Sequence, residues 1–338
     1  MDMSSILGMQ VPVVPHSNEL SIFRSDSYVG IEIEMENVAS STIRGLRSWR
    51  QVSEQSVDGW ELVLREPKCS HGLFLAIDEL RTISGNVNEQ RTFTERTSNH
   101  IHIDIRDMTY LQLMNFLTLA VMFEPVLFKY VASHRTSNHF CWSFLDCQNL
   151  ITRIKKVNKA YLTGNERAVR DRIASEFTTG ATKYSAINLS SIPRYGSLEF
   201  RMHEGTLNVN AIIRWINILL SLKNYAMDQD RTPSNILETK QDVGIDSIFT
   251  AVLGEYRGIL TYEGVEDDIL AGIRSAQDFV YHITNANQPI VLPSNPRGVY
   301  HRFLGTLNQQ LLRERGRREL TNANDSSSNS PSNFNLGA

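Results

Sequence analysis

A strict alternation of apolar and polar residues over Ser27–Glu36 is the feature that most constrains the fold of this chain. A period of two predicts a β-strand, because successive side chains of a strand point to opposite faces of the sheet. Glu32, Glu34 and Glu36 then line one face at intervals of about 6.6 Å. The other face is apolar and is formed by Ile31, Ile33 and Met35.

Three further stretches alternate in the same way, with acidic, imidazole or guanidinium groups on the polar side. They are Trp60–Arg65, His100–Ile105 and Ser197–His203, and none of the four stretches contains the lysine or threonine usual on a solvated sheet face. Carboxylates this close together repel one another unless a cation lies between them, so the pattern favours a site for divalent cations and an anionic ligand. The alternative for any one strand is a plain solvated face. We call the predicted surface the charged face; its members are Glu32, Glu34, Glu36, Glu61, His100, His102, Asp104, Glu199, Arg201 and His203.

Helical periodicity separates these strands and dominates the last third of the chain. A long, nearly all-apolar helix to about residue 127 is expected after an N-cap at either Asp107 or Thr109. Strands with one apolar face, interleaved with helices, predict an α+β fold: an antiparallel sheet with helices packed on one face and an open cleft on the other. Further helices are predicted at 71–83, 147–162, 165–178, from Asn208 to 222 and after 230, with a short strand at 184–189.

Between the first two strands the chain is polar, and Arg44, Arg47 and Arg50 recur every three residues. This spacing indicates either a short helix or basic loop that bends over the acidic face, or a solvated helix surface.

The overall composition is that of an ordinary soluble protein, with 41% hydrophobic residues, 21% charged residues and a net charge of -3. Nothing in it calls for nucleic acid or an acidic membrane surface as a partner. The longest apolar run is interrupted by Glu124, Pro125 and Lys129, so no membrane span is expected. No secretory signal is evident, and three cysteines without a Cys-x-x-Cys spacing fit a reducing cytoplasm.

Six short motifs, taken in order, resemble the amidoligase family of phages and bacteria, which is grouped with glutamine synthetase and glutamate-cysteine ligase. The resemblance covers about residues 27–226. The motifs are Gly30-x-Glu32-x-Glu34, Asp58-Gly-Trp-Glu61-Leu-Val, His100-x-His102-x-Asp104, Arg135-x-x-Asn138-x-x-Cys141, Tyr184-x-Ala186-x-Asn188-Leu and Leu198-Glu-Phe-Arg201-x-x-Glu204-Gly-Thr206.

The resemblance implies an ATP-dependent carboxylate–amine ligase on a glutamine-synthetase-like antiparallel sheet. By similarity, Glu32, Glu34, Glu61 and Glu199 would hold Mg²⁺, His102 would bind metal or phosphate, and Arg201 would neutralise the γ-phosphate. Arg201, Glu199 and Glu34 form the expected catalytic set, and Arg135 and Asn138 join the expected cofactor-binding set. The implied domains are an arm at 1–24, a catalytic domain at 25–228, a helical region at 229–318 and a disordered tail at 319–338.

The chemistry of such a reaction matches the charged face without reference to the family. An amide forms from a carboxylate only after activation, commonly as an acyl phosphate that an amine then attacks. Phosphoryl transfer needs cations that bridge the phosphates and a group that offsets developing charge, and Mg²⁺ prefers oxygen ligands. The expected partners are therefore ATP, Mg²⁺, and a carboxylate and an amine carried by an amino acid, a peptide or a protein side chain. A homo-oligomer is left open, and the expected location is the cytoplasm, that of the host if the chain is phage-encoded.

Several residues keep two interpretations. Tyr184 and Asn188 either contact nucleotide or substrate or are packed structurally, and Lys183 either binds phosphate or is solvated. Glu199 and Arg201 either serve the site or form a structural ion pair along the strand. Glu36, at the strand end, is expected to be exposed. Cys141 is expected to be a buried structural cysteine rather than a nucleophile. Two other functions remain: a non-catalytic binding or scaffold protein with the same fold, and a cupin-like metal enzyme suggested by His100-x-His102, which requires an all-β barrel.

Overall fold

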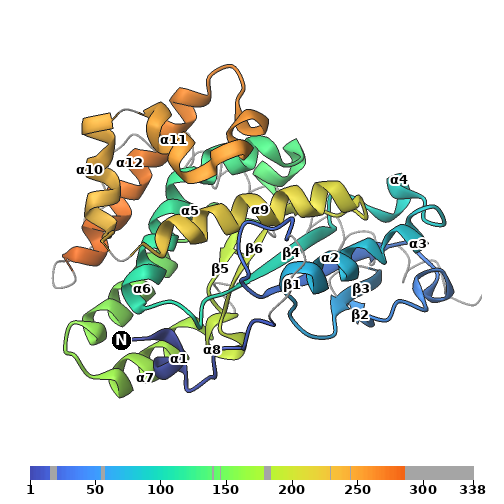
Figure 1. Ribbon diagram of the computed structural model, residues 1–338, viewed down its shortest axis with the longest axis horizontal. Helices are drawn as coiled ribbons and strands as arrows, with labels where there is room; N and C mark the ends of the chain where they lie inside the picture. Colours follow the sequence, from blue (N-terminus) through green and yellow to red (C-terminus); the bar gives the residue numbers. More distant parts are fainter. Residues whose placement is uncertain are drawn as a thin grey trace, which may run out of the picture. The chain divides into compact units, whose positions relative to one another are not determined.

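A six-stranded antiparallel sheet in the order β2-β3-β1-β4-β6-β5 is the centre of the structure (Figure 1). Its strands are β1 (Val29–Glu36), β2 (Trp49–Glu54), β3 (Gly59–Leu64), β4 (Ser98–Asp104), β5 (Ile187–Asn188) and β6 (Ser197–Glu204). The predicted α+β fold is confirmed. The computed structural model describes residues 1–15, 21–54, 58–138, 141–144, 146–178, 184–228, 230–243 and 245–285.

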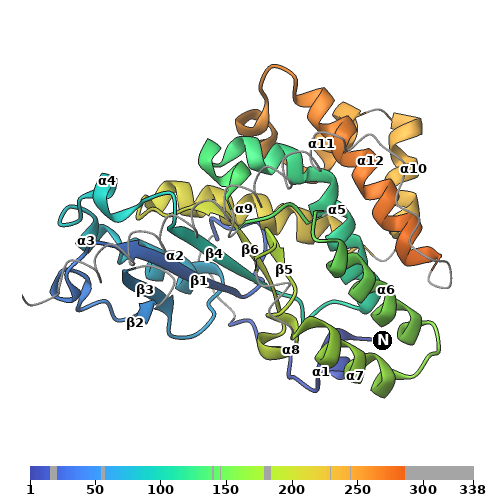
Figure 2. The same ribbon diagram turned by 180° about the vertical axis from the view of Figure 1, so that it is seen from behind.

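The alternating sequence pattern divides the sheet into an apolar face and a polar face, as the period of two requires. Ile31 and Ile33 of β1, Ile101 of β4 and Phe200 of β6 are fully buried. They point to the side that carries the helices, and in Figure 2 the strands lie in front of α2 (Ser70–Asp78) and α9 (Val209–Ala226).

A β-bulge interrupts the pairing of β4 with β6. Ile101 lies opposite Phe200, but Asn99 lies opposite His203, so β6 has one extra residue between these pairs. A single extra residue turns all later side chains to the other face. His203 therefore points to the helix side, where its ring lies 5.4 Å from that of Trp215 in α9. The prediction that His203 belongs to the charged face is wrong for this reason.

The main core helix is α5 (Tyr110–Tyr130), which is buried along most of its length. Of the two predicted caps, Thr109 is the one used: its hydroxyl accepts a hydrogen bond from Gln112 N, and the Gln112 side chain accepts one from Thr109 N. Asp107 instead binds the buried Lys223 Nζ of α9 at 2.7 Å. Within the described residues, α5 is long and apolar enough to cross a membrane, but 83% of its most apolar window is buried inside the fold.

The remaining helices extend this core. α12 (Val265–Thr284) packs along α5, and α6 (Gln148–Tyr161) packs against α7 (Glu166–Phe177). After α9 the described chain is helical up to α12, as predicted. The other helical segments are α1 (Met3–Leu7), η1 (Ser40–Ile43), α3 (Arg81–Ser84), α4 (Glu89–Thr92), η2 (Ser133–Ser137), α8 (Ile192–Tyr195), α10 (Pro233–Val243), α11 (Ile245–Leu253) and η4 (Gly254–Leu260).

Strand β2 and helix α1 are among the elements that were not predicted. Strand β2 forms because Trp49 is buried, with its indole Nε1 donating to Ala76 O, while Arg50 on the opposite side stays exposed. This places the three arginines neither on one helix nor in one loop: Arg50 lies on β2, and Arg44 and Arg47 lie between η1 and β2. The expected N-terminal arm contains α1, whose carbonyls at Ser5 and Ile6 accept hydrogen bonds from Arg170 of α7.

Residues 1–288 form one compact unit. The predicted boundary at 228/229 falls inside it, and the predicted domain division stays a prediction. The expected tail at 319–338 lies outside the described residues.

Candidate functional site

The strand register brings the predicted acidic and imidazole groups onto one face. Glu34 lies opposite Glu61, and Glu32 lies opposite His100. His102 in turn lies opposite Glu199, which links the face across three strand pairs. The four strands predicted to share a face do share one.

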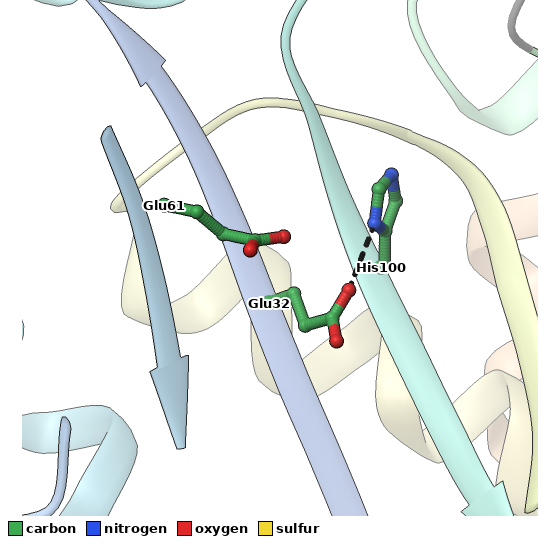
Figure 3. A group of neighbouring side chains, drawn as sticks. All are labelled: Glu32, Glu61 and His100. Carbon is green, nitrogen blue, oxygen red and sulfur yellow. Dashed lines mark hydrogen bonds and ion pairs between the residues drawn. The ribbon is translucent and has the colours of Figure 1, made fainter. Parts of the chain in front are cut away.

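Two groups of three side chains come close enough to hold a cation, and Glu32 belongs to both. The first is Glu32, Glu61 and His100, and the second is Glu32, His102 and Glu199; within each group the ligand atoms lie within 4.8 Å of one another. Figure 3 shows the first group, contributed by β1, β3 and β4, with the Glu32 carboxylate turned toward the His100 ring.

His100 lies at the centre of a buried network. Its Nδ1 is 3.2 Å from Glu32 Oε2 and 3.3 Å from Arg201 Nη1, and its Nε2 is 2.8 Å from Ser98 Oγ. Ser98 Oγ donates its proton to Glu34 Oε2 at 2.6 Å, so His100 Nε2 must carry the proton shared with Ser98. The other ring nitrogen, Nδ1, faces Glu32.

Glu199 is fixed through both of its oxygens. Arg201 Nη1 donates to Oε1 at 2.6 Å, and Asn188 Nδ2 donates to Oε2 at 2.6 Å. Burial alone would raise the pKa of Glu199, but Arg201, His102 and His100 outweigh burial and lower it. Burial likewise opposes ionisation of Arg201, whereas Glu199 and Glu34 raise its pKa above the usual value.

Glu32 and His102 stabilise each other's charged forms. Burial alone would raise the pKa of Glu32, but the adjacent His100 and His102 imidazoles hold it well below its usual value. Burial would lower the pKa of His102, yet Glu199 and Glu32 raise it. His102 Nε2 is 3.4 Å from Glu32 Oε1, a contact too poorly aligned to count as a hydrogen bond, so this buried nitrogen has no hydrogen-bond partner among the described residues.

These residues fit a divalent cation such as Mg²⁺. Two carboxylates and one imidazole leave open positions for water or phosphate oxygens, and carboxylate-rich sets suit Mg²⁺ or Mn²⁺. The poorly aligned His102 Nε2 and the shared Glu32 carboxylate both supply ligand atoms that the protein itself does not use fully.

Other predicted site residues lie elsewhere. Arg135 is fully buried and donates to the backbone carbonyls of Arg201 and Met202, so it supports β6 at the bulge and has no exposed surface for a nucleotide. Asn138 donates to Glu95 O at 2.6 Å. Tyr184 is exposed, and Lys183 lies outside the described residues.

The structure also bears on two further predictions, the exposure of Glu36 and the burial of Cys141. Glu36 was expected to be exposed at the strand end, but it is buried and accepts a hydrogen bond from Thr94 Oγ1 at 2.6 Å. Cys141 is buried as expected, and burial raises the pKa of its thiol to about 11, so it is protonated at neutral pH.

Sequence reasoning missed Ser98 and Ser197, which hold Glu34 and His102. The alternation of β4 and β6 places both on the charged face, so the period-two pattern contained the signal.

Part of the chain matches the sequence model of a known protein family. Residues 73–223 match the model of a family described as a putative amidoligase enzyme. The resemblance predicted from the motifs is confirmed over this region, which is somewhat less than half of the chain. His100, His102, Glu199 and Arg201 lie inside the match, whereas β1 and β3, with Glu32, Glu34 and Glu61, precede it. No curated protein matches the chain.

Proposed function

We propose that this protein is an ATP-dependent carboxylate–amine ligase that forms an amide or isopeptide bond through an acyl-phosphate intermediate. The amidoligase match supports a ligase in general terms. The observation that carries the finer proposal is the pair of three-residue groups that share Glu32, placed beside the buried Arg201.

In this proposal Glu32, Glu61 and His100 would hold one Mg²⁺, and Glu32, His102 and Glu199 would hold another. Cations held there would supply positive charge beside the phosphates during phosphoryl transfer. The ligands sit on paired strands, and Ser98, Ser197 and Asn188 fix the neighbouring side chains by hydrogen bonds. This rigidity is what orientation-dependent catalysis needs.

Arg201 has the role of offsetting negative charge on the transferred phosphoryl group. Its Nη1 is engaged by Glu199, but its Nε is buried without a hydrogen-bond partner among the described residues. An unused guanidinium donor in a buried site is well suited to an anionic oxygen. Glu199, and Glu34 held by Ser98, raise the pKa of this guanidinium further.

Of the two alternative functions, the cupin-like enzyme is excluded by the fold, because the described sheet is open and covered by helices rather than closed into a barrel. The non-catalytic binding protein is separated from the ligase by experiment.

The test uses the full chain with ATP, Mg²⁺ and mixtures of amino acids and amines. Release of ADP and phosphate that depends on both a carboxylate and an amine is expected. Because substrates are not known in advance, binding of Mn²⁺, a spectroscopic substitute for Mg²⁺, is measured in parallel by electron paramagnetic resonance.

Glu32→Gln is the most informative variant, since it removes a ligand from both groups. Loss of a supporting residue alone typically costs 10–100-fold in metal affinity, so a shared ligand should cost about 100-fold or more. Glu89→Gln, an exposed carboxylate in the first turn of α4, is the matched control and should bind as the wild type does. Wild-type Mn²⁺ binding by a folded Glu32→Gln protein would contradict the assigned site. Mn²⁺ binding without Mg-ATP binding would favour the non-catalytic alternative.

A further inference from the structure

A pocket of about 220 Å³ adjoins the charged face at the end of the sheet where β1 begins. Glu32 and His102, members of the second three-residue group, form part of its lining, and Arg50 and Arg65 form another part. The pocket is therefore continuous with the proposed metal site but extends away from it.

Strand pairing places both arginines over this pocket. Val63 of β3 lies opposite Glu32 of β1 on one side and opposite Arg50 of β2 on the other. Residues paired in this way share a face, and Arg65, two positions beyond Val63, follows the same alternation. Arg65 is additionally held by a hydrogen bond from its Nε to Arg47 O at 3.0 Å.

The charges in the pocket do not cancel. Asp104 is bound by Arg106 through two hydrogen bonds, at 2.8 and 3.0 Å, and Glu32 contacts His100 and His102. Arg50 and Arg65 form no ion pair with any residue that the structure describes, although Arg65 Nε is hydrogen bonded as stated above. Because Asp104 and Glu32 already have partners of their own, the guanidinium groups of Arg50 and Arg65 are left to bind a ligand.

The rest of the pocket gives room and an apolar wall. Gly30 leaves space where a Cβ would approach His102 Cβ to 3.2 Å. The Tyr195 ring stands edge-on to the His102 ring, with centroids 5.9 Å apart at 86°, and Tyr195 is 61% exposed. A ligand in the pocket can thus contact an aromatic side chain while its charged end meets the arginines.

We infer that this pocket is an oxyanion subsite, in which Arg50 and Arg65 bind a carboxylate or phosphate of the ligand whose reacting group lies at Glu32 and His102. Guanidinium groups bind such planar or tetrahedral oxyanions by paired hydrogen bonds. Assigning the ligand to the reaction rests on the proposed function, which supplies two sources: a second carboxylate of the acid substrate, or the phosphates of the nucleotide.

The test is binding of simple oxyanions to the full chain by isothermal titration calorimetry, without turnover. The probes are glutarate, a dicarboxylate, and pyrophosphate, each with and without Mg²⁺. Arg50→Gln/Arg65→Gln should weaken binding of at least one probe about tenfold or more, since hydrogen bonds from charged donors are the strong ones. A selective loss of glutarate binding identifies the acid substrate as the source, and a selective loss of pyrophosphate binding identifies the nucleotide.

Arg44→Gln/Arg47→Gln is the control, because it removes the same charge from exposed residues of the adjoining segment that do not line the pocket. It should change the affinities less than about twofold. Equal binding by the Arg50/Arg65 variant and the wild type overturns the subsite, as does failure of the wild type to bind either probe at millimolar concentration. Loss of probe binding in the Arg50/Arg65 variant, together with no binding of Mg-ATP by the wild type, would retain the subsite and reject the ligase.

Discussion

Glu199 is held in a fixed position in the site by two neighbouring side chains. Its two oxygens are held by Arg201 and Asn188, and all three side chains are buried. Removing one member of a buried ion pair leaves an uncompensated charge and typically costs 3–5 kcal/mol of stability. Arg201→Ala therefore changes folding as well as chemistry, and substitutions that keep the hydrogen-bonding atoms are better probes of the site.

Asn188→Asp is such a substitution. It replaces the amide that donates to Glu199 Oε2 by a second carboxylate, while Oδ1 can still accept from Ser190 N. Without divalent cations the repulsion and the lost donor should lower the free energy of unfolding by about 1–3 kcal/mol. Millimolar Mg²⁺ should restore part of this loss, which urea denaturation in EDTA and in Mg²⁺ would measure.

Asn208→Asp provides the control for that experiment. Asn208 caps α9 through Oδ1, and Asp caps a helix equally well, so its stability should stay near that of the wild type in both buffers. An Asn188→Asp protein as stable as the wild type in EDTA would show that Glu199 is not ionised there.

At the scale of elements, α5 carries a buried carboxylate that anchors a neighbouring segment. Glu124 accepts hydrogen bonds from Ser143 Oγ at 2.6 Å and from Phe144 N at 2.7 Å. The same segment forms an isolated bridge with the residues just before β5, because Trp142 N donates to Tyr184 O and Ala186 N donates to Trp142 O. The Glu124 carboxylate thus links helix α5 to the segment that contacts the residues just before Asn188.

This arrangement predicts a pH-dependent stability. Burial raises the pKa of Glu124 to about 7, from an ordinary value of 4.5 that the unfolded chain would keep. Between these pH values the folded state holds a proton that the unfolded state has lost. The contribution of Glu124 to stability is therefore greatest at low pH and falls as pH rises, by up to about 3 kcal/mol above pH 7.

Glu124→Gln should remove this slope, because the amide stays uncharged while its oxygen still accepts from Phe144 N. The variant should gain stability relative to the wild type as pH rises through about 5 to about 8, measured by urea denaturation at each pH. Parallel pH profiles of the two proteins would rule out Glu124 as the titrating group.

At the scale of the whole described unit, the helices after residue 228 complete the core. α12 lies so close to α5 that a Cβ on Gly272 would come within 1.8 Å of Met122 O. Phe279 of α12 packs edge-on against Phe144, and Phe249 of α11 stacks on Phe123 of α5. Removing the helices after residue 228 would expose the apolar side chains of α5 that they cover. The result would be a large apolar patch of the kind that soluble monomers rarely carry.

A fragment of residues 1–228 should therefore fail to fold cooperatively, whereas residues 1–288 should unfold in a single transition. Circular dichroism during thermal denaturation and size-exclusion chromatography compare the two. A soluble 1–228 fragment with a cooperative transition would instead support the domain boundary predicted from the sequence at 228/229.

Local sequence pattern was enough to predict the strands β1, β3, β4 and β6, the long helices, and the side of each strand that carries charge. Thr109 and Asp107 were equal candidates for the α5 cap, because both residue types cap helices, and only the pairing of Asp107 with Lys223 decided between them. Strand β2 was missed because its burial depends on Trp49 reaching Ala76, a contact between distant residues.

The sequence by itself determined that acids, imidazoles and a guanidinium lie on one side of alternating strands, because the period of two is a property of each strand alone. The tertiary structure decided which of them meet. Pairing register placed Glu32 between His100, His102 and Val63, and the bulge in β6 turned His203 away from the site. Register and bulges arise from contacts between strands far apart in the chain, so no local pattern contains them.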